Sequence, residues 1–149
     1  MADDTLDIVE KLIETCRDGQ AGYLEAAELA RNAALQGFFS NQAMERARFA
    51  AALEHLAIRL GETDPSRSTS IANQLHRAWI DLRHRLGGGD ASVLQSVELG
   101  ESNAQHHYRA ALQAGLPPEV HRIVEEQAES VSAALDQVRA LRSVYKRAA

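Results

Sequence analysis

Hydrophobic and polar positions alternate along most of the chain with the spacing of an α-helix. The clearest stretch runs from position 94 to 111, where core-type positions recur at alternating steps of three and four residues. This spacing places them on one face of a helix. The positions are Leu94, Val97, Glu101, Ala104, Tyr108 and Ala111. Because an apolar core does not suit a free carboxylate, Glu101 must have a partner, a proton or a metal ion there.

The same spacing predicts further helices on both sides of this stretch. We expect one helix from about 4 to 34 and a second from about 38 to 60, joined by a turn at Gln36-Gly37. The stripe of the second helix is Phe38, Gln42, Glu45, Phe49, Ala52 and Leu56. Asp90 is a good N-cap for the helix that contains Glu101, and Pro117-Pro118 begins the last helix. The short first turn makes the first two helices antiparallel neighbours.

A shorter helical pattern lies in the long connection between the second and third of these helices. It covers about 69 to 86 and contains the only tryptophan, Trp79. Four long amphipathic helices with a helix inside one long connection predict an all-α four-helix bundle with a crossover, and ferritin-like folds contain such a long connection. The length of 149 residues fits a single domain, 1–149.

Composition and charge narrow the function classes. The formal net charge of -5 argues against nucleic acid as a partner, because phosphate binding needs concentrated lysine and arginine. A single cysteine, Cys16, excludes an internal disulfide and favours the reducing cytoplasm. Since no uncharged apolar run approaches the length of a membrane span, membrane insertion is not expected.

Four segments resemble a bacterial ferritin-like domain family of unknown function, whose members are four-helix-bundle proteins. The segments are LIETCRDGQAGY at 12–23, LHRAWIDL at 75–82, LPPEV at 116–120 and VRALR at 138–142. The resemblance covers nearly the whole chain, and the tryptophan-containing segment is its most specific part. It implies the bundle fold and says little about activity, because a fold does not determine function.

Ferritin-like di-iron proteins bind metal with a glutamate from each of two helices and a Glu-x-x-His pair from each of the other two. Iron or manganese would suit such a carboxylate-rich site. Glu101 resembles the glutamate of the third helix, but its counterpart on the first helix is the uncharged Gln20. On the second helix Glu45 is followed by Arg48, where histidine would be needed.

Helix register makes a complete metal site less plausible. Reflection about the first turn places Gln20 opposite 52–53, where His55 is present but no glutamate precedes it at Ala52. Reflection about the last turn places Glu101 near Val131. The resemblance implies an acidic residue in place of Ala52 and a histidine in place of Leu135, and the chain departs from both. The remaining metal candidates are Glu101, Glu45 and His55.

A simpler interpretation is that Glu101 is a buried acid paired with Arg48, Gln20 or Tyr23. We therefore expect a buried polar cluster made of Gln20, Arg48, Gln127, Tyr23 and Tyr108. Cys16 falls on the apolar stripe of the first helix and is expected to be a small buried residue.

Three functions are compatible with these patterns. The leading one is a non-enzymatic bundle that acts through assembly or partner binding, most simply as a homodimer. The second is a metal-binding or oxidase-like protein, with iron or manganese in a reduced carboxylate site. The third is a small-molecule carrier with a ligand held between helices.

Overall fold

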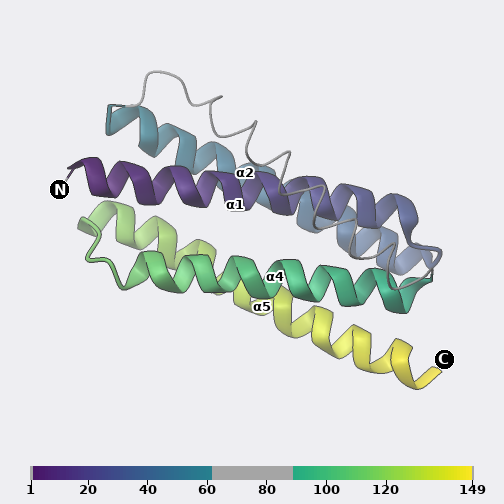
Figure 1. The fold of residues 1–149 in the computed structure, drawn as a ribbon. Helices are drawn as coiled ribbons and strands as arrows, with labels where there is room; N and C mark the ends of the chain where they lie inside the picture. The colour runs from purple at the N-terminus through teal and green to yellow at the C-terminus, as the bar shows by residue number, and fades with distance from the viewer. Residues whose placement is uncertain (1, 62–88, 149) are drawn as a thin grey trace.

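The computed structural model describes residues 2–61 and 89–148, and this part of the chain consists of four α-helices (Figure 1). They are α1 (Ala2–Leu29), α2 (Ala33–Arg59), α4 (Asp90–Leu112) and α5 (Pro118–Ala148). The prediction of an all-α four-helix bundle is confirmed. The helix expected at 69–86, which contains Trp79, lies outside the described residues.

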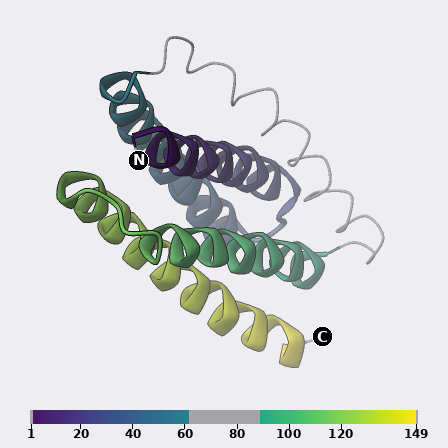
Figure 2. The ribbon, with the colours of Figure 1, turned by 60° about the vertical axis from the view of Figure 1, so that its left-hand side comes forward.

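The helices form two antiparallel pairs that pack against each other, α1 with α2 and α4 with α5 (Figures 1 and 2). Tyr23 on α1 contacts both Arg46 on α2 and Glu101 on α4, so these three helices meet at this point. α2 and α4 run in the same direction. Gly61 and Gly89 therefore lie at opposite ends of the bundle (Figure 1).

The turn between α1 and α2 comes earlier than expected. The side chain of Asn32 accepts a hydrogen bond from the backbone N–H of Leu35 at 3.1 Å and caps α2. α2 consequently begins at Ala33, and Gly37 lies inside the helix. The expected turn at Gln36-Gly37 was wrong because a good N-cap residue outweighs one glycine.

Asp90 does not cap its own helix, which was the expected role. The N-cap of α4 is Gly89, with φ of 100°, a backbone conformation that suits glycine. The two carboxylate oxygens of Asp90 instead accept hydrogen bonds from the backbone N–H groups of Arg31 at 2.7 Å and Asn32 at 3.0 Å. Asp90 thus ties the start of α4 to the turn between α1 and α2.

The earlier start of α2 goes with a different buried face. The buried positions of this helix are Leu35, Phe39, Ala43, Arg46, Ala50, Leu53, Leu56 and Ala57. The expected stripe differs from this face by about one residue, so Glu45 is half-buried and Arg46 is in the core. On α4 the expected stripe is correct, since all six of its positions are buried.

The core consists of two apolar clusters, one towards each end of the bundle. Val9, Leu53 and Val124 belong to the first, and Phe39, Leu94 and Val138 to the second. Arg46 and Glu101 are buried but belong to neither cluster. Within 2–61 and 89–148, none of the helices combines the length and apolar character that crossing a bilayer requires.

Candidate functional site

A buried ion pair joins α2 to α4 inside the bundle. Arg46 donates from both terminal guanidinium nitrogens to the two carboxylate oxygens of Glu101, each at 2.6 Å. Both side chains are almost completely buried, with exposed fractions of 2% and 1%. This two-point geometry is the strongest way in which arginine binds a carboxylate.

Tyr23 completes this cluster from α1. Its hydroxyl donates to Glu101 Oε2 at 2.5 Å, and the guanidinium carbon of Arg46 lies 5.5 Å from the centre of its ring. Burial raises the pKa of Tyr23, and the charge of Glu101 raises it further, so the hydroxyl keeps its proton. Burial alone would lower the pKa of Arg46, but the Glu101 carboxylate outweighs it and the net pKa is raised. The cluster therefore holds one full positive and one full negative charge.

Arg46 also packs against Gly19 on α1. A Cβ atom added at Gly19 would lie 3.5 Å from Cγ and from one terminal nitrogen of Arg46. This is ordinary contact distance, so the guanidinium and its stem lie directly against the backbone of α1. The Nε of Arg46 is buried and has no hydrogen-bond partner among the described residues. The arginine is thus held mainly by Glu101.

A second chain of buried polar groups lies next to the ion pair. Tyr108 donates to Gln127 Oε1 at 2.7 Å, and Gln127 donates to the backbone carbonyl of Phe49 at 3.3 Å. Because the Tyr108 proton is used in this way, the thiol of Cys16, 2.9 Å away, is the donor in their contact. Burial raises the pKa of the Cys16 thiol to about 11, so it is protonated and is a poor nucleophile.

The expected metal candidates do not form a metal-binding set. Both oxygens of Glu101 are bound to Arg46, His55 is exposed, and Glu45 is half-buried. Within the described part of the chain, no three histidine, cysteine, aspartate or glutamate side chains gather in a metal-binding arrangement. The guanidinium supplies the positive charge that a metal ion would bring, so these residues do not fit an iron or manganese centre.

The register of α5 against α4 also differs from the expected one. Gln105 contacts Ser132, and Glu98 contacts Arg139, so Glu101 faces the turn around Leu135 and not Val131. The register predicted by reflection about the last turn was wrong, because the residues from 113 to 117 form a non-helical loop. This loop shifts α5 by about one helical turn along α4. Leu135 is fully buried, whereas Ala52 is exposed.

The expected polar cluster needs one replacement. Tyr23, Tyr108 and Gln127 are buried, but Arg48 is exposed and the arginine in the core is Arg46. This correction follows from the different face of α2. Gln20 is half-buried and accepts a hydrogen bond from Arg17 at 2.9 Å, so it lies at the edge of the core.

A polar pocket opens over this cluster between α1 and α4. Its volume is about 160 Å³, and Gly19, Gly100 and Glu101 form part of its lining. Asp18 also lines it; burial raises the pKa of this carboxyl to about 7, and its Oδ1 is buried without a hydrogen-bond partner among the described residues. Nothing in the helical spacing alone identified Asp18, because its significance depends on the facing helix.

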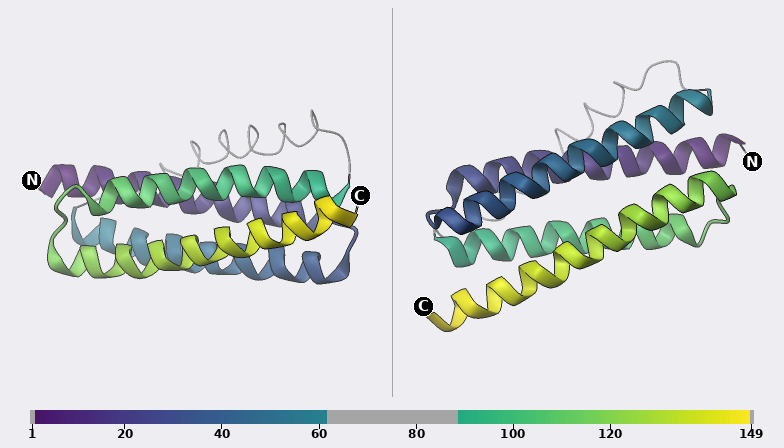
Figure 3. Two further views of the ribbon diagram at one scale, coloured as in Figure 1. Left: turned by 90° about the horizontal axis from the view of Figure 1, so that it is seen from below. Right: turned by 180° about the vertical axis from the view of Figure 1, so that it is seen from behind.

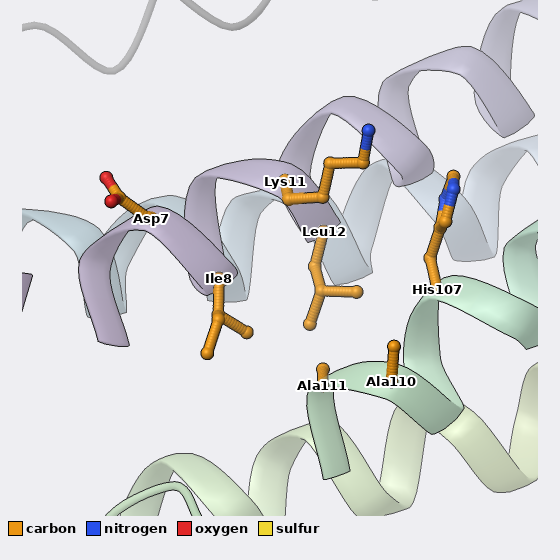
Figure 4. Close-up of a pocket in the computed structure, with 7 residues that line it drawn as sticks. All are labelled: Asp7, Ile8, Lys11, Leu12, His107, Ala110 and Ala111. Atoms are coloured by element: carbon orange, nitrogen blue, oxygen red, sulfur yellow. The ribbon is translucent and has the colours of Figure 1, made fainter. Parts of the chain in front are cut away.

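An apolar groove adjoins this pocket along the same pair of helices (Figure 4). Its volume is about 280 Å³, and Figure 4 shows Ile8 and Leu12 of α1 extending toward Ala110 and Ala111 of α4. Its lining includes His107, which also lines the polar pocket. The seam between α1 and α4 therefore holds an apolar and a polar space side by side.

Residues 4–114 match a protein family described as Domain of unknown function (DUF2383). The chain belongs to this family. The matched residues contain nearly all of α1 and the whole of α2 and α4, with Tyr23, Arg46 and Glu101. No curated protein matches the chain.

Membership in the DUF2383 family does not assign an activity to the bundle, because this is a domain of unknown function and a fold does not determine function. The expected bacterial ferritin-like family is thereby supported only as a family of unknown function, and its ferritin-like descent stays a prediction. α5 lies beyond the matched residues and supplies Gln127 and Leu135 to the core.

Proposed function

We propose that this DUF2383 protein is a metal-independent helical bundle that acts by assembly and not by redox catalysis. The observation that supports this most directly is the pairing of Arg46 with both oxygens of Glu101. A metal ion at Glu101 would have to displace a bound guanidinium and remain next to it. Because two cations would then share one carboxylate in a buried site, electrostatic repulsion opposes metal binding there.

Metal analysis of the full chain, purified without chelators, tests the first part of this proposal. We expect far less than one iron or manganese per chain and the same unfolding temperature with and without a chelator. Stoichiometric iron or manganese that is lost in Glu101→Ala would contradict the proposal and favour the metal-binding alternative.

The surface of α5 supports self-assembly. Its exposed acidic residues lie in the first two thirds of the helix. Its exposed basic residues lie in the last third, apart from Arg122, which pairs with Glu126. The acidic residues are Glu119, Glu125, Glu126, Glu129 and Asp136, and the basic ones include Arg139 and Lys146. Two copies of α5 in antiparallel contact would place each acidic segment against a basic one. Such a twofold contact is self-complementary, as homodimer interfaces require.

An apolar stripe runs along the same helix. Ala133, Ala140 and Val144 are exposed and recur at steps of seven and four, so they share one face. α5 also contacts α2 only sparsely, and its C-terminal end lies apart from α1 and α2 (Figure 3). A second copy of α5 could therefore pack on this face without displacing a helix of the bundle.

Size-exclusion chromatography with light scattering tests the assembly. We expect a dimer that dissociates more readily at high salt, because charge complementarity supports it. Glu129→Lys should weaken the dimer, whereas Glu28→Lys, which reverses an exposed charge on α1, should leave it unchanged. A strict monomer at working concentrations, or equal effects of the two variants, would contradict assembly through α5.

A further inference from the structure

The apolar groove and the polar pocket are neighbours along the seam of α1 and α4. Lys11 and His107 line both, so they stand at the junction. Lys11 is exposed, and its ammonium group can reach water. The arrangement suits a small molecule with an apolar tail and a polar head, because ligand sites combine apolar walls with a few polar groups.

Hydrogen bonds define the protonation of His107 at this junction. The hydroxyl of Thr15 donates to the backbone carbonyl of Lys11 at 3.0 Å, and it also lies 3.0 Å from Nδ1 of His107. Since the single hydroxyl proton is already used, Nδ1 carries a proton and donates to Thr15. The imidazole is neutral, because burial and then the charge of Lys11 lower its pKa, and its Nε2 is left as an acceptor.

The polar pocket offers acceptors for a donor ligand. Asp18 Oδ1 is buried and lacks a hydrogen-bond partner within the described residues, which is costly for a carboxyl oxygen. Glu101 contributes no free charge, because Arg46 already neutralises it. The amide of Asn103, which also lines the pocket, adds a further polar group.

We propose that the seam binds a small amphipathic amine, with its ammonium group at Asp18 and its apolar tail between Ile8, Leu12 and Ala110. The ammonium group would donate to Oδ1 of Asp18, which has no hydrogen-bond partner among the described residues. A carboxylate head fits less well, because it would place a second negative charge beside Asp18. This site is separate from the α5 surface and does not depend on assembly.

Calorimetric titration of the full chain with n-hexylamine tests the proposal. n-Hexanoate, which has a tail of similar length and the opposite charge, is the matched ligand control. We expect saturable one-to-one binding of the amine and at least about tenfold weaker binding of the carboxylate. Asp18→Asn keeps the shape of the side chain and should weaken amine binding by at least about tenfold, since a charged hydrogen bond is lost.

A second variant tests the placement of the tail. Ala110 is exposed, so Ala110→Phe should fill the groove without disturbing the core and should abolish binding. Ala51→Phe, at an exposed alanine on α2, is the matched control and should bind as the wild type does. Circular dichroism verifies that all variants are folded. Absence of saturable amine binding, equal binding of hexanoate, or unchanged binding by Asp18→Asn or Ala110→Phe would overturn the proposal.

Discussion

Arg46 and Glu101 place two opposite charges in a core that is otherwise largely apolar. Removing such charges from water is costly, and close pairing with additional hydrogen bonds offsets this cost. Here Glu101 accepts from two guanidinium nitrogens and from Tyr23. Because each charge depends on the other, losing one partner is far more damaging than losing both.

We therefore expect Arg46→Met to lower the free energy of unfolding by about 3–5 kcal/mol, since it leaves Glu101 charged and buried without its partner. The double variant Arg46→Met with Glu101→Met should be clearly more stable than the single one. Urea unfolding followed by circular dichroism measures both. Arg48→Met, at an exposed position, is the control and should change the free energy by no more than about 0.5 kcal/mol. A double variant less stable than Arg46→Met would contradict this account.

Asp18 should make the stability depend on pH. Burial raises its pKa from 3.8 to about 7, so between these values the folded chain binds more protons at this site than the unfolded chain does. This contribution to stability is complete below about pH 4 and is lost as the pH rises through 7.

Unfolding temperatures of wild type and Asp18→Asn, measured from pH 4 to 8, test this dependence. The gain in stability from Asp18→Asn should increase across this range, because the amide cannot ionise. Asn41→Ala, on the exposed face of α2, should show the wild-type dependence. A pH-independent difference between wild type and Asp18→Asn would show that the carboxyl does not titrate as described.

At the scale of the helices, α2 depends on where it begins. Asn32 caps its first turn, and Asp90 of α4 holds the backbone N–H groups just before it. The start at Ala33 includes Leu35 in the buried face and brings Arg46 to the core. The local Asn32 cap and the long-range hydrogen bonds from Asp90 together determine which face of α2 is buried.

Asn32→Ala should reduce the free energy of unfolding by about 1 kcal/mol, because it leaves a backbone N–H of the first turn without its acceptor. Thermal or urea unfolding provides the measurement. Asn41→Ala again serves as a control, because its side chain is exposed in the middle of the same helix. The cap would be unimportant if both variants had the same stability.

For the molecule as a whole, the helices do not contribute equally to the core. α1 packs extensively on α2, while α5 touches α2 sparsely and its C-terminal end lies apart from α1 and α2 (Figures 1 and 3). Val120, Val124 and Val131 in the first half of α5 are buried, whereas Leu141 and Tyr145 are only half-buried. The last turns of α5 are therefore held by fewer contacts.

Hydrogen exchange should report this difference. We expect amides from 140 to 146 to exchange faster than those from 124 to 135, because segments with little buried surface open at a lower free energy. Mass spectrometry of peptides from a timed exchange measures both segments. Dimerisation through α5 should slow exchange in the later segment, so dilution to monomer should restore it. Equal protection in dilute protein would contradict the uneven packing.

Much of the architecture could be predicted from the sequence. The spacing within α4 placed Glu101 correctly in the core, because its own helix is regular from Asp90 to Leu112. Arg46 was missed because the buried face of α2 depends on the start of the helix and on Asp90, which lies in the other half of the chain. Asp18 was missed because a half-buried polar residue leaves no mark in the hydrophobic pattern.

The sequence by itself determined the helices, their antiparallel pairing and the presence of an acid among apolar positions, since these follow from local periodicity and short turns. Only the tertiary structure decided which cation pairs with Glu101. It also decided that Thr15 of α1 contacts His107 of α4. These contacts depend on the rotation and axial shift of one helix against another. Small changes in a cap or a loop alter both quantities, and helical spacing within a single segment does not record them.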